Sequence, residues 1–223
     1  MNSIEKLKQS FTNKDLFDQA MTHRSWVNEH KGIRESNERM EFLGDAILEF
    51  VVSKEIYNDY VDKEEGYLTA LRASLVNTIA LSEISINLNL GPELFLSKGE
   101  EDGGGRSNPS LLADTVEAFI GAIFIDKGII EAEEFIKKYI LVNAKDKAAQ
   151  PLKDCKSRLQ EMIQAKGYSA PKYQVVEESG PDHDKKFVIE VLVNGESWGK
   201  GEGKSKSTAE QEAACQVLTK KVQ

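Results

Sequence analysis

The stretch NERMEFLGDAILEF, Asn37 to Phe50, has the apolar spacing of an α-helix but carries several acidic residues. On such a helix Glu38, Glu41 and Asp45 fall along one stripe, where like charges repel by about 0.2–0.5 kcal/mol per pair. Gly44 inside the helix costs about 1 kcal/mol more than alanine would. Two unfavourable features in one helix indicate that the stripe has a role other than stabilising it.

The surrounding residues 1–145 are predicted to form an all-α domain, because apolar residues recur at helical spacing in four stretches. The segment EDGGGRSNPS, Glu101 to Ser110, is predicted to be a loop because it contains three consecutive glycines and a proline. Asn108 and Pro109 suit the N-cap and first turn of the following helix. The four helical stretches are Met40–Val52, Tyr67–Leu81, Leu111–Phe124 and Glu131–Leu141.

The pattern changes after residue 145. Residues 146–152 lose apolar periodicity and contain a proline, so we interpret them as a linker. Within residues 153–223, helical CKSRLQEMIQAK is followed by three strand-like runs and a closing helix, STAEQEAACQVLTKKV. The second and third runs meet at Asn194-Gly195, a strong hairpin signal. The α-β-β-β-α order predicts a small α+β domain.

Net charge is −8, which taken alone argues against a nucleic-acid partner. The charge is uneven, however. Residues 151–223 contain 12 Lys and Arg against 11 Asp and Glu, and the remaining 150 residues contain 17 against 26. The acidic total therefore does not exclude a local surface that binds nucleic acid.

Composition places the chain among soluble globular proteins, with 40% hydrophobic and 30% charged residues. The N-terminal residues lack the apolar core of a secretory signal, and the longest apolar run, Ala118 to Ile125, is too short to cross a membrane. No membrane association is expected. The two cysteines, Cys155 and Cys215, are too few for a disulfide framework, so we expect reduced thiols in a cytoplasmic protein.

A second acidic pair, Asp114 and Glu117, lies in the apolar segment LLADTVEAFIGAIF. A solvated helix face is one interpretation of such a pair. The apolar surroundings favour another, because unpaired carboxylates are costly to bury. Gly44 and Gly121 would allow two helices to approach closely, and four carboxylates would then converge.

A cluster of carboxylates without histidine suits Mg²⁺ or Mn²⁺ better than zinc. His23, His30 and His183 all lie outside the acidic segments, and no Glu-x-x-His motif indicates a di-iron site. Hard cations held by carboxylates recur in enzymes of phosphoryl transfer, where they activate water and stabilise the leaving oxygen.

The motifs together resemble the bacterial ribonuclease III family. NERMEFLGDAILEF is similar to the family signature, and ADTVEAFIGAIFID to its second catalytic helix. THRS, EGYLTALRASLVN and GGR, which begin at Thr22, Glu65 and Gly104, also resemble family segments in the family's order. The C-terminal part resembles a double-stranded RNA-binding domain. The resemblance covers nearly the whole chain.

This resemblance implies an endoribonuclease that hydrolyses double-stranded RNA with Mg²⁺, for which Mn²⁺ would substitute. It implies 5′-phosphate and 3′-hydroxyl ends, after a cation-activated water attacks phosphorus in line with the departing 3′ oxygen. Asp45 and Glu117 match the most critical metal ligands and are the expected catalytic residues. Glu41 and Asp114 would complete the metal site or hold its waters.

The family also implies a two-fold homodimer with one catalytic centre per subunit. Glu38 and Glu65 match positions near the subunit interface. Phe42 would fill a pocket on the partner, although ordinary core packing is an alternative for this side chain. His23 is expected to be structural.

In the second domain, the resemblance implies contacts with RNA phosphates and minor-groove hydroxyls from three segments. The sequence departs from the family at Ser207 and Thr208, where basic residues are usual. Hydroxyls release fewer counterions than lysine or arginine, so RNA binding would be weaker and less salt-dependent. The matching residues are Gln160 and Glu161, then Pro181, Asp182 and His183, then Lys204 and Lys206.

Two other functions are compatible with parts of the sequence. A non-catalytic protein that binds double-stranded RNA could retain this scaffold, but the four intact carboxylates argue against it. A helical metal protein without RNA would leave the second domain unexplained. Processing of ribosomal RNA precursors, messenger RNA and small RNA is what the family implies for the cell.

Overall fold

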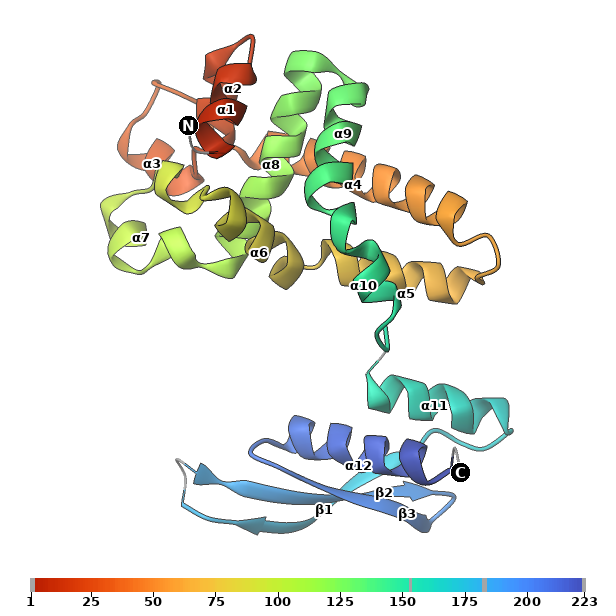
Figure 1. The fold of residues 1–223 in the computed structure, drawn as a ribbon. Coiled ribbons are helices and arrows are strands. Elements are labelled where there is room, and N and C mark those ends of the chain that lie inside the picture. Colours follow the sequence, from red (N-terminus) through yellow and green to blue (C-terminus); the bar gives the residue numbers. More distant parts are fainter. Residues whose placement is uncertain (1–2, 153, 182–183, 222–223) are drawn as a thin grey trace. The chain divides into compact units, whose positions relative to one another are not determined.

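The computed structural model describes residues 3–152, 154–181 and 184–221. The chain divides into two compact units, Met1–Leu152 and Lys153–Gln223 (Figure 1). The division falls at the end of the expected linker, part of which is helical because α10 spans Ala144–Ala148. None of the helices among the described residues is long and apolar enough to cross a membrane.

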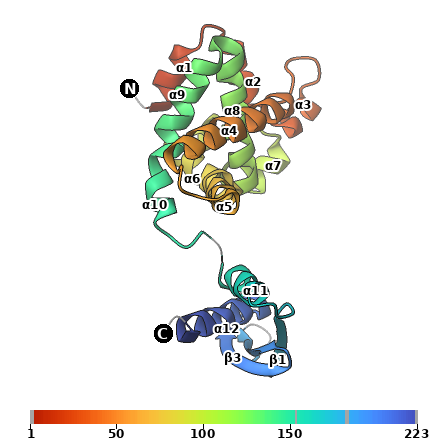
Figure 2. The ribbon, with the colours of Figure 1, turned by 90° about the vertical axis from the view of Figure 1, so that its right-hand side faces the viewer.

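The described part of the first unit is helical (Figures 1 and 2). The largest contact between its helices is that of α4 with α8, which carry the two acidic segments. The α-helices are α1 (Ser3–Ser10), α2 (Lys14–Ala20), α3 (Arg24–Glu29), α4 (Glu38–Asp59), α5 (Glu65–Val76), α6 (Thr78–Leu88), α7 (Lys98–Asp102), α8 (Pro109–Lys127), α9 (Ile129–Tyr139) and α10; three 3₁₀ turns are η1 (Gly91–Glu93), η2 (Gly105–Ser107) and η3 (Leu141–Asn143).

The crossing of α4 and α8 depends on two glycines, as the sequence predicted. A Cβ atom on Gly44 would lie 1.7 Å from the backbone oxygen of Glu117. A Cβ atom on Gly121 would lie 2.2 Å from the backbone oxygen of Met40. Any side chain at either position would push the helices apart. The crossing therefore compensates for the low helix propensity of glycine.

The predicted single helical run Tyr67–Leu81 is wrong, because the chain forms two helices separated at Asn77. Asn77 has an extended backbone, and its side chain accepts a hydrogen bond from the backbone N–H of Ala80. Asparagine competes with the helix in this way and favours a new N-cap. The apolar periodicity continues through both helices and so hides the break.

The glycine-rich segment before α8 is more structured than the predicted loop, since it contains the end of α7 and the turn η2. Arg106 holds it in place: its Nη1 donates to the backbone oxygens of Gly91, Pro92 and Leu94 at 2.9–3.1 Å. The expected start of α8 is confirmed, because the Asn108 side chain accepts from the Ser110 N–H and Pro109 follows at the first helical position.

The second unit has the predicted α-β-β-β-α order, which confirms the fold class of the chain. Helices α11 (Cys155–Ala165) and α12 (Lys206–Lys221) cover one face of an antiparallel sheet (Figures 1 and 2). Its strands are β1 (Lys172–Ser179), β2 (Lys186–Val193) and β3 (Glu196–Gly203), in that order. Asn194 and Gly195 have φ values of 51° and 86°, as the predicted hairpin between β2 and β3 requires.

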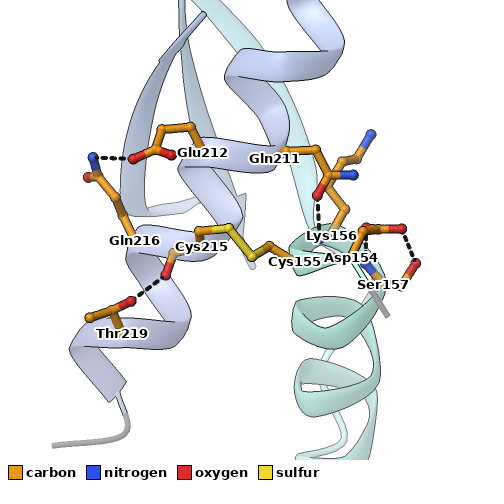
Figure 3. The surroundings of a disulfide bond; sticks show 9 residues. All are labelled: Asp154, Cys155, Lys156, Ser157, Gln211, Glu212, Cys215, Gln216 and Thr219. Carbon is orange, nitrogen blue, oxygen red and sulfur yellow. Dashed lines mark hydrogen bonds between the residues drawn. A yellow bond between two sulfur atoms is a disulfide. The ribbon is translucent and has the colours of Figure 1, made fainter. Parts of the chain in front are cut away.

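The expectation of reduced thiols is wrong. Cys155 and Cys215 form a disulfide that joins α11 to α12 (Figure 3). Packing of the two helices against one sheet brings their Cα atoms to 5.0 Å, within the range that a disulfide spans. The two residues are 60 positions apart, and the presence of only two cysteines in the sequence did not indicate that they would be close in space.

Candidate functional site

The helix crossing brings three carboxylates together. Oxygen atoms of Glu41 on α4 and of Asp114 and Glu117 on α8 all lie within 4.8 Å of one another. All three side chains are half-buried. Asp45, the fourth predicted ligand, is exposed one turn further along α4 and lies outside this group of three.

The cluster is electrostatically strained without a cation. Burial, followed by the charges of Asp45 and Asp114, raises the pKa of Glu117 to about 7. Burial and the neighbouring charge of Asp114 also raise the pKa of Glu41, and burial raises the pKa of Asp114. Among the described residues, no lysine or arginine contributes to the pKa shifts of these three acids, so their negative charges are not offset by either of these residue types. A cation bound among the oxygens would relieve this repulsion.

A pocket of about 230 Å³ adjoins the cluster, and Glu41 and Asp114 form part of its wall. His23 lines the same pocket. Its Nδ1 lies 2.8 Å from Ser25 Oγ and accepts from the Ser25 backbone N–H, so the ring caps α3. The His23 backbone N–H donates to the Phe95 carbonyl. These contacts fit a structural residue, although a charged imidazole would lower the pKa of Asp114.

Two further polar residues of this pocket were not predicted as site residues. Arg24 forms an ion pair with Glu38 at 3.0 Å, and Asn37 is buried, with its side chain donating to the carbonyl of Ala20. Their only sequence signal is their position, within THRS and at the start of the family signature. Neither spacing nor charge pattern showed that these segments would meet.

The three residues predicted at the dimer contact occupy two places. Glu38 and Phe42 lie in the first turns of α4, and Phe42 is 80% exposed, so it is not a core residue of the subunit. Glu65 begins α5 and accepts a hydrogen bond from Thr69. Arg72 near the end of α5 pairs with Glu49 at 2.7 Å.

Near Glu65 there is a hollow of about 380 Å³ between α4 and α5. Its wall includes Ile56, Tyr57 and Leu68, together with Lys63 and Arg72. Along α4, Phe42, Phe50 and Tyr57 are all large and exposed, at 80%, 60% and 71%. The first unit therefore presents an apolar stripe and, toward the far end of the same helix, a hollow.

In the second unit, the predicted RNA-contacting residues lie at the surface where they are described. Gln160 and Glu161 are exposed on α11, and Pro181 is exposed between β1 and β2. Asp182 and His183 lie outside the described residues. Lys204 pairs with Asp184 at 3.2 Å, which ties the β3–α12 connection to the β1–β2 loop.

Ser207 and Thr208, where the family usually has basic residues, lie in the first turn of α12, and Thr208 has a structural role there. Lys206 is exposed at the first helical position, with its Nζ 5.7 Å from the Phe187 ring centroid. Ser205 Oγ accepts from the Thr208 backbone N–H at 3.1 Å and lies 2.8 Å from Thr208 Oγ1. Thr208 thus contributes to the cap of the helix, a role that was not predicted.

These features define a helical unit with a cluster of three carboxylates, and a small α+β unit with exposed lysines at a helix start. A family profile described as "Ribonuclease-III-like" matches residues 13–144, and one described as "Double-stranded RNA binding motif" matches residues 155–221. The chain belongs to the ribonuclease III family, as the resemblance implied, and is an endoribonuclease acting on double-stranded RNA.

Individual proteins similar to this chain also belong to the ribonuclease III family. Proteins named Ribonuclease 3 from Bacillus cereus (strain G9842) and Bacillus cytotoxicus are 45% identical over 97% of this chain and 89% of their own length. Two solved structures of the ribonuclease III nuclease domain from Campylobacter jejuni are 41% and 40% identical, each with a TM-score of 0.57. They cover 63% and 64% of this chain and 97% of theirs, and one describes a region involved in dimer formation.

Proposed function

We propose that this endoribonuclease hydrolyses phosphodiester bonds with Mg²⁺ and leaves 5′-phosphate and 3′-hydroxyl ends. The observation that carries the proposal is the convergence of Glu41, Asp114 and Glu117 across the α4–α8 crossing. Oxygen-only ligands suit a hard cation, and Mn²⁺ would substitute because it accepts the same ligands.

The donor set fits such a cation. Burial raises the pKa of all three acids, and neighbouring negative charges raise it further at Glu41 and Glu117. A bound cation would have the opposite effect, because it favours the ionised carboxylates. A bound Mg²⁺ supplies a water of lowered pKa and neutralises charge that develops on the phosphate. The protein's part is to hold the acids rigidly around that position.

We assign a role to each of the four acids. Glu41, Asp114 and Glu117 would hold the cation, and the backbone crossing at Gly44 fixes the separation of the two helices. We assign Asp45 to the same site, as a critical ligand together with Glu117. Its charge raises the pKa of both Glu41 and Glu117, which supports this assignment.

We further propose a two-fold homodimer built on α4. Phe42 of one subunit would enter the hollow beside Glu65 on its partner, and the apolar stripe of α4 would be covered. Exposed aromatic residues in a row are typical of an interface. The Campylobacter jejuni nuclease domain, described as having a region involved in dimer formation, supports a dimer built by this unit.

For RNA binding we propose the exposed residues of the second unit. Lys204 and Lys206 would meet phosphates at the start of α12, and Gln160 and Glu161 would face the minor groove from α11. Pro181 and His183 would contact RNA from the β1–β2 loop. Processing of ribosomal RNA precursors, messenger RNA and small RNA in the cytoplasm is the cellular function proposed for the chain.

The decisive experiment is incubation of the purified protein with long duplex RNA, in Mg²⁺ or in EDTA. We expect cleavage only with the cation, and products that accept ligation at the 5′ end without prior phosphorylation. Mn²⁺ should restore cleavage after EDTA treatment. RNA binding without any metal-dependent cleavage would refute the proposal in favour of a non-catalytic RNA-binding protein.

A further inference from the structure

The second unit contains a covalent link that the proposed catalysis and RNA binding do not use. Cys155 is the first residue of α11, and Cys215 lies within α12 (Figure 3). The two cysteines are 60 positions apart, and all three strands of the sheet lie between them. The disulfide therefore closes nearly the whole unit into one loop.

The disulfide lies on the core side of α11. Cys155 packs against the hydrophobic cluster that contains Leu159 and Ile163, both fully buried. Gln160 and Glu161, which we assign to RNA contact, are exposed on the same helix. Opening the disulfide would therefore act on the core and leave the RNA-facing side chains in place.

Noncovalent contacts hold the same junction independently of the sulfur atoms. The Lys156 backbone N–H donates to Gln211 Oε1 at 3.2 Å (Figure 3), and Lys156 Nζ pairs with Glu210 at 2.5 Å. Asp154 caps α11 by accepting from the Ser157 N–H at 3.0 Å. With these contacts intact, two thiols would remain close together, so the disulfide could form again.

We propose that the disulfide between Cys155 and Cys215 is reduced and re-formed reversibly. When formed, it stabilises the RNA-binding unit against unfolding and leaves its RNA-contacting surface unchanged. Both residues are only partly buried, which leaves them open to a small reagent. A dithiol reductant attacks one sulfur as its thiolate, the S–S bond breaks and the other cysteine leaves as a thiolate. The second thiol of the reductant then releases the first cysteine, so two electrons and two protons pass to the protein and the reductant becomes a disulfide.

The size of the effect follows from the loop. A small unit has a limited core and depends on additional constraints for stability. Closing a loop of 60 residues restricts the unfolded chain, and losing that restriction should lower the folded-to-unfolded ratio by about a thousandfold. For a unit of this length the melting temperature should fall by on the order of 25 °C. In a thiol-rich compartment the unit would lack this extra stability, and oxidation would restore it.

The test uses the full chain, oxidised or reduced with dithiothreitol, and a Cys155→Ser/Cys215→Ser double variant. Amide hydrogen exchange at increasing urea, resolved by peptide, reports each unit separately. We expect dithiothreitol to lower the urea midpoint of peptides from α11, β2 and α12. Peptides from α8 in the first unit serve as an internal control and should not change. The double variant should match the reduced protein and should not respond to dithiothreitol.

Three results would overturn the inference. The first is alkylation of both cysteines in native protein that has been exposed to oxidised dithiothreitol. The second is an unchanged urea midpoint in the wild-type second unit after reduction, a measurement that does not depend on the folding of any variant. The third is a loss of duplex-RNA affinity greater than about threefold on reduction at 25 °C without urea, which would mean that the RNA surface had changed. The exchange measurements hold whether or not the protein cleaves RNA.

Discussion

Glu117 combines burial with charge repulsion more than its neighbours do, since the pKa of its side chain is raised to about 7 by burial and by Asp45, Asp114, Glu41 and Glu49. Such a cost is unnecessary in a structural residue. It is explained if the carboxylate is kept in place for a cation that the folded protein binds.

We therefore expect Glu117→Gln to lower the rate of Mg²⁺-dependent cleavage by at least about a hundredfold, because one anionic ligand is lost at nearly constant shape. Affinity for duplex RNA in EDTA should stay within about twofold, since the RNA surface is untouched. Cleavage assays and filter binding measure the two quantities. Glu131→Gln, an exposed acid on α9, is the matched control and should cleave normally. Full activity in Glu117→Gln would remove Glu117 from the site.

Tyr173 gives a residue-level prediction in the second unit. Its Oη is buried without a hydrogen-bond partner among the described residues, and burial, then Glu210 and Asp154, raises its pKa to about 12. Because this folded-state pKa exceeds the ordinary value of 10, the unfolded chain releases the phenol proton first. The free energy of unfolding is therefore unaffected by this group below pH 10 and falls as pH rises toward 12.

Tyr173→Phe should remove this alkaline loss and, at neutral pH, raise the free energy of unfolding by up to about 1 kcal/mol, because an unpaired buried hydroxyl is gone. Urea titrations at pH 8 and pH 11, followed by Trp198 fluorescence in a Trp26→Phe background, measure both effects. Tyr168→Phe, at a tyrosine that is 42% exposed, should leave the pH dependence as it is. Equal alkaline loss in Tyr173→Phe would contradict the assignment.

Among the elements, the α4–α8 crossing determines both the core of the first unit and the geometry of its acids. Gly44→Ala would place a Cβ atom 1.7 Å from the Glu117 carbonyl oxygen, so the helices must separate. We expect a loss of about 1–3 kcal/mol in the free energy of unfolding, together with weaker metal binding. Thermal denaturation with and without Mg²⁺ measures both.

Gly66→Ala is the control for that substitution. Gly66 lies in the first turn of α5, and nothing lies within 4 Å of the Cβ atom it would gain. Alanine there should be neutral or should stabilise the helix by up to about 1 kcal/mol. If both variants lose stability equally, the close approach of α4 and α8 is not what requires Gly44.

At this scale the sequence predicted a good deal of the structure for clear reasons. Glycine within two acidic and otherwise apolar segments was enough to predict a close helix crossing, because glycine allows close approach and buried carboxylates need a shared partner. The break at Asn77 was missed, since a side-chain cap leaves the apolar period unchanged. The disulfide and the capping role of Thr208 were missed because both depend on contacts made only after folding. The sequence analysis ranked Asp45 above Glu41 as a metal ligand, whereas Glu41 is the α4 acid whose oxygen joins those of Asp114 and Glu117 within 4.8 Å.

For the whole molecule, the first question is whether two chains associate. Phe42→Ala removes the most exposed aromatic of the α4 stripe, and we expect the dimer dissociation constant to rise by at least about tenfold. Sedimentation over a range of protein concentrations measures this constant. Ile130→Ala, at a side chain 68% exposed on α9, should have no effect. A monomeric wild-type protein at micromolar concentration would rule out the proposed interface.

The second question is how the two units share the work of binding RNA. The first unit holds the acidic cluster, and residues 1–150 carry 17 basic against 26 acidic residues, so alone they should attract RNA poorly. Residues 151–223 contribute exposed lysines, whose phosphate contacts release counterions. A chain ending at residue 150 should therefore retain Mg²⁺-dependent cleavage at about 20 mM salt and lose most of it near 150 mM, where weak RNA contacts are screened. Initial cleavage rates of both proteins across a salt series measure the effect. Equal rates near 150 mM would show that the first unit binds its substrate without the second.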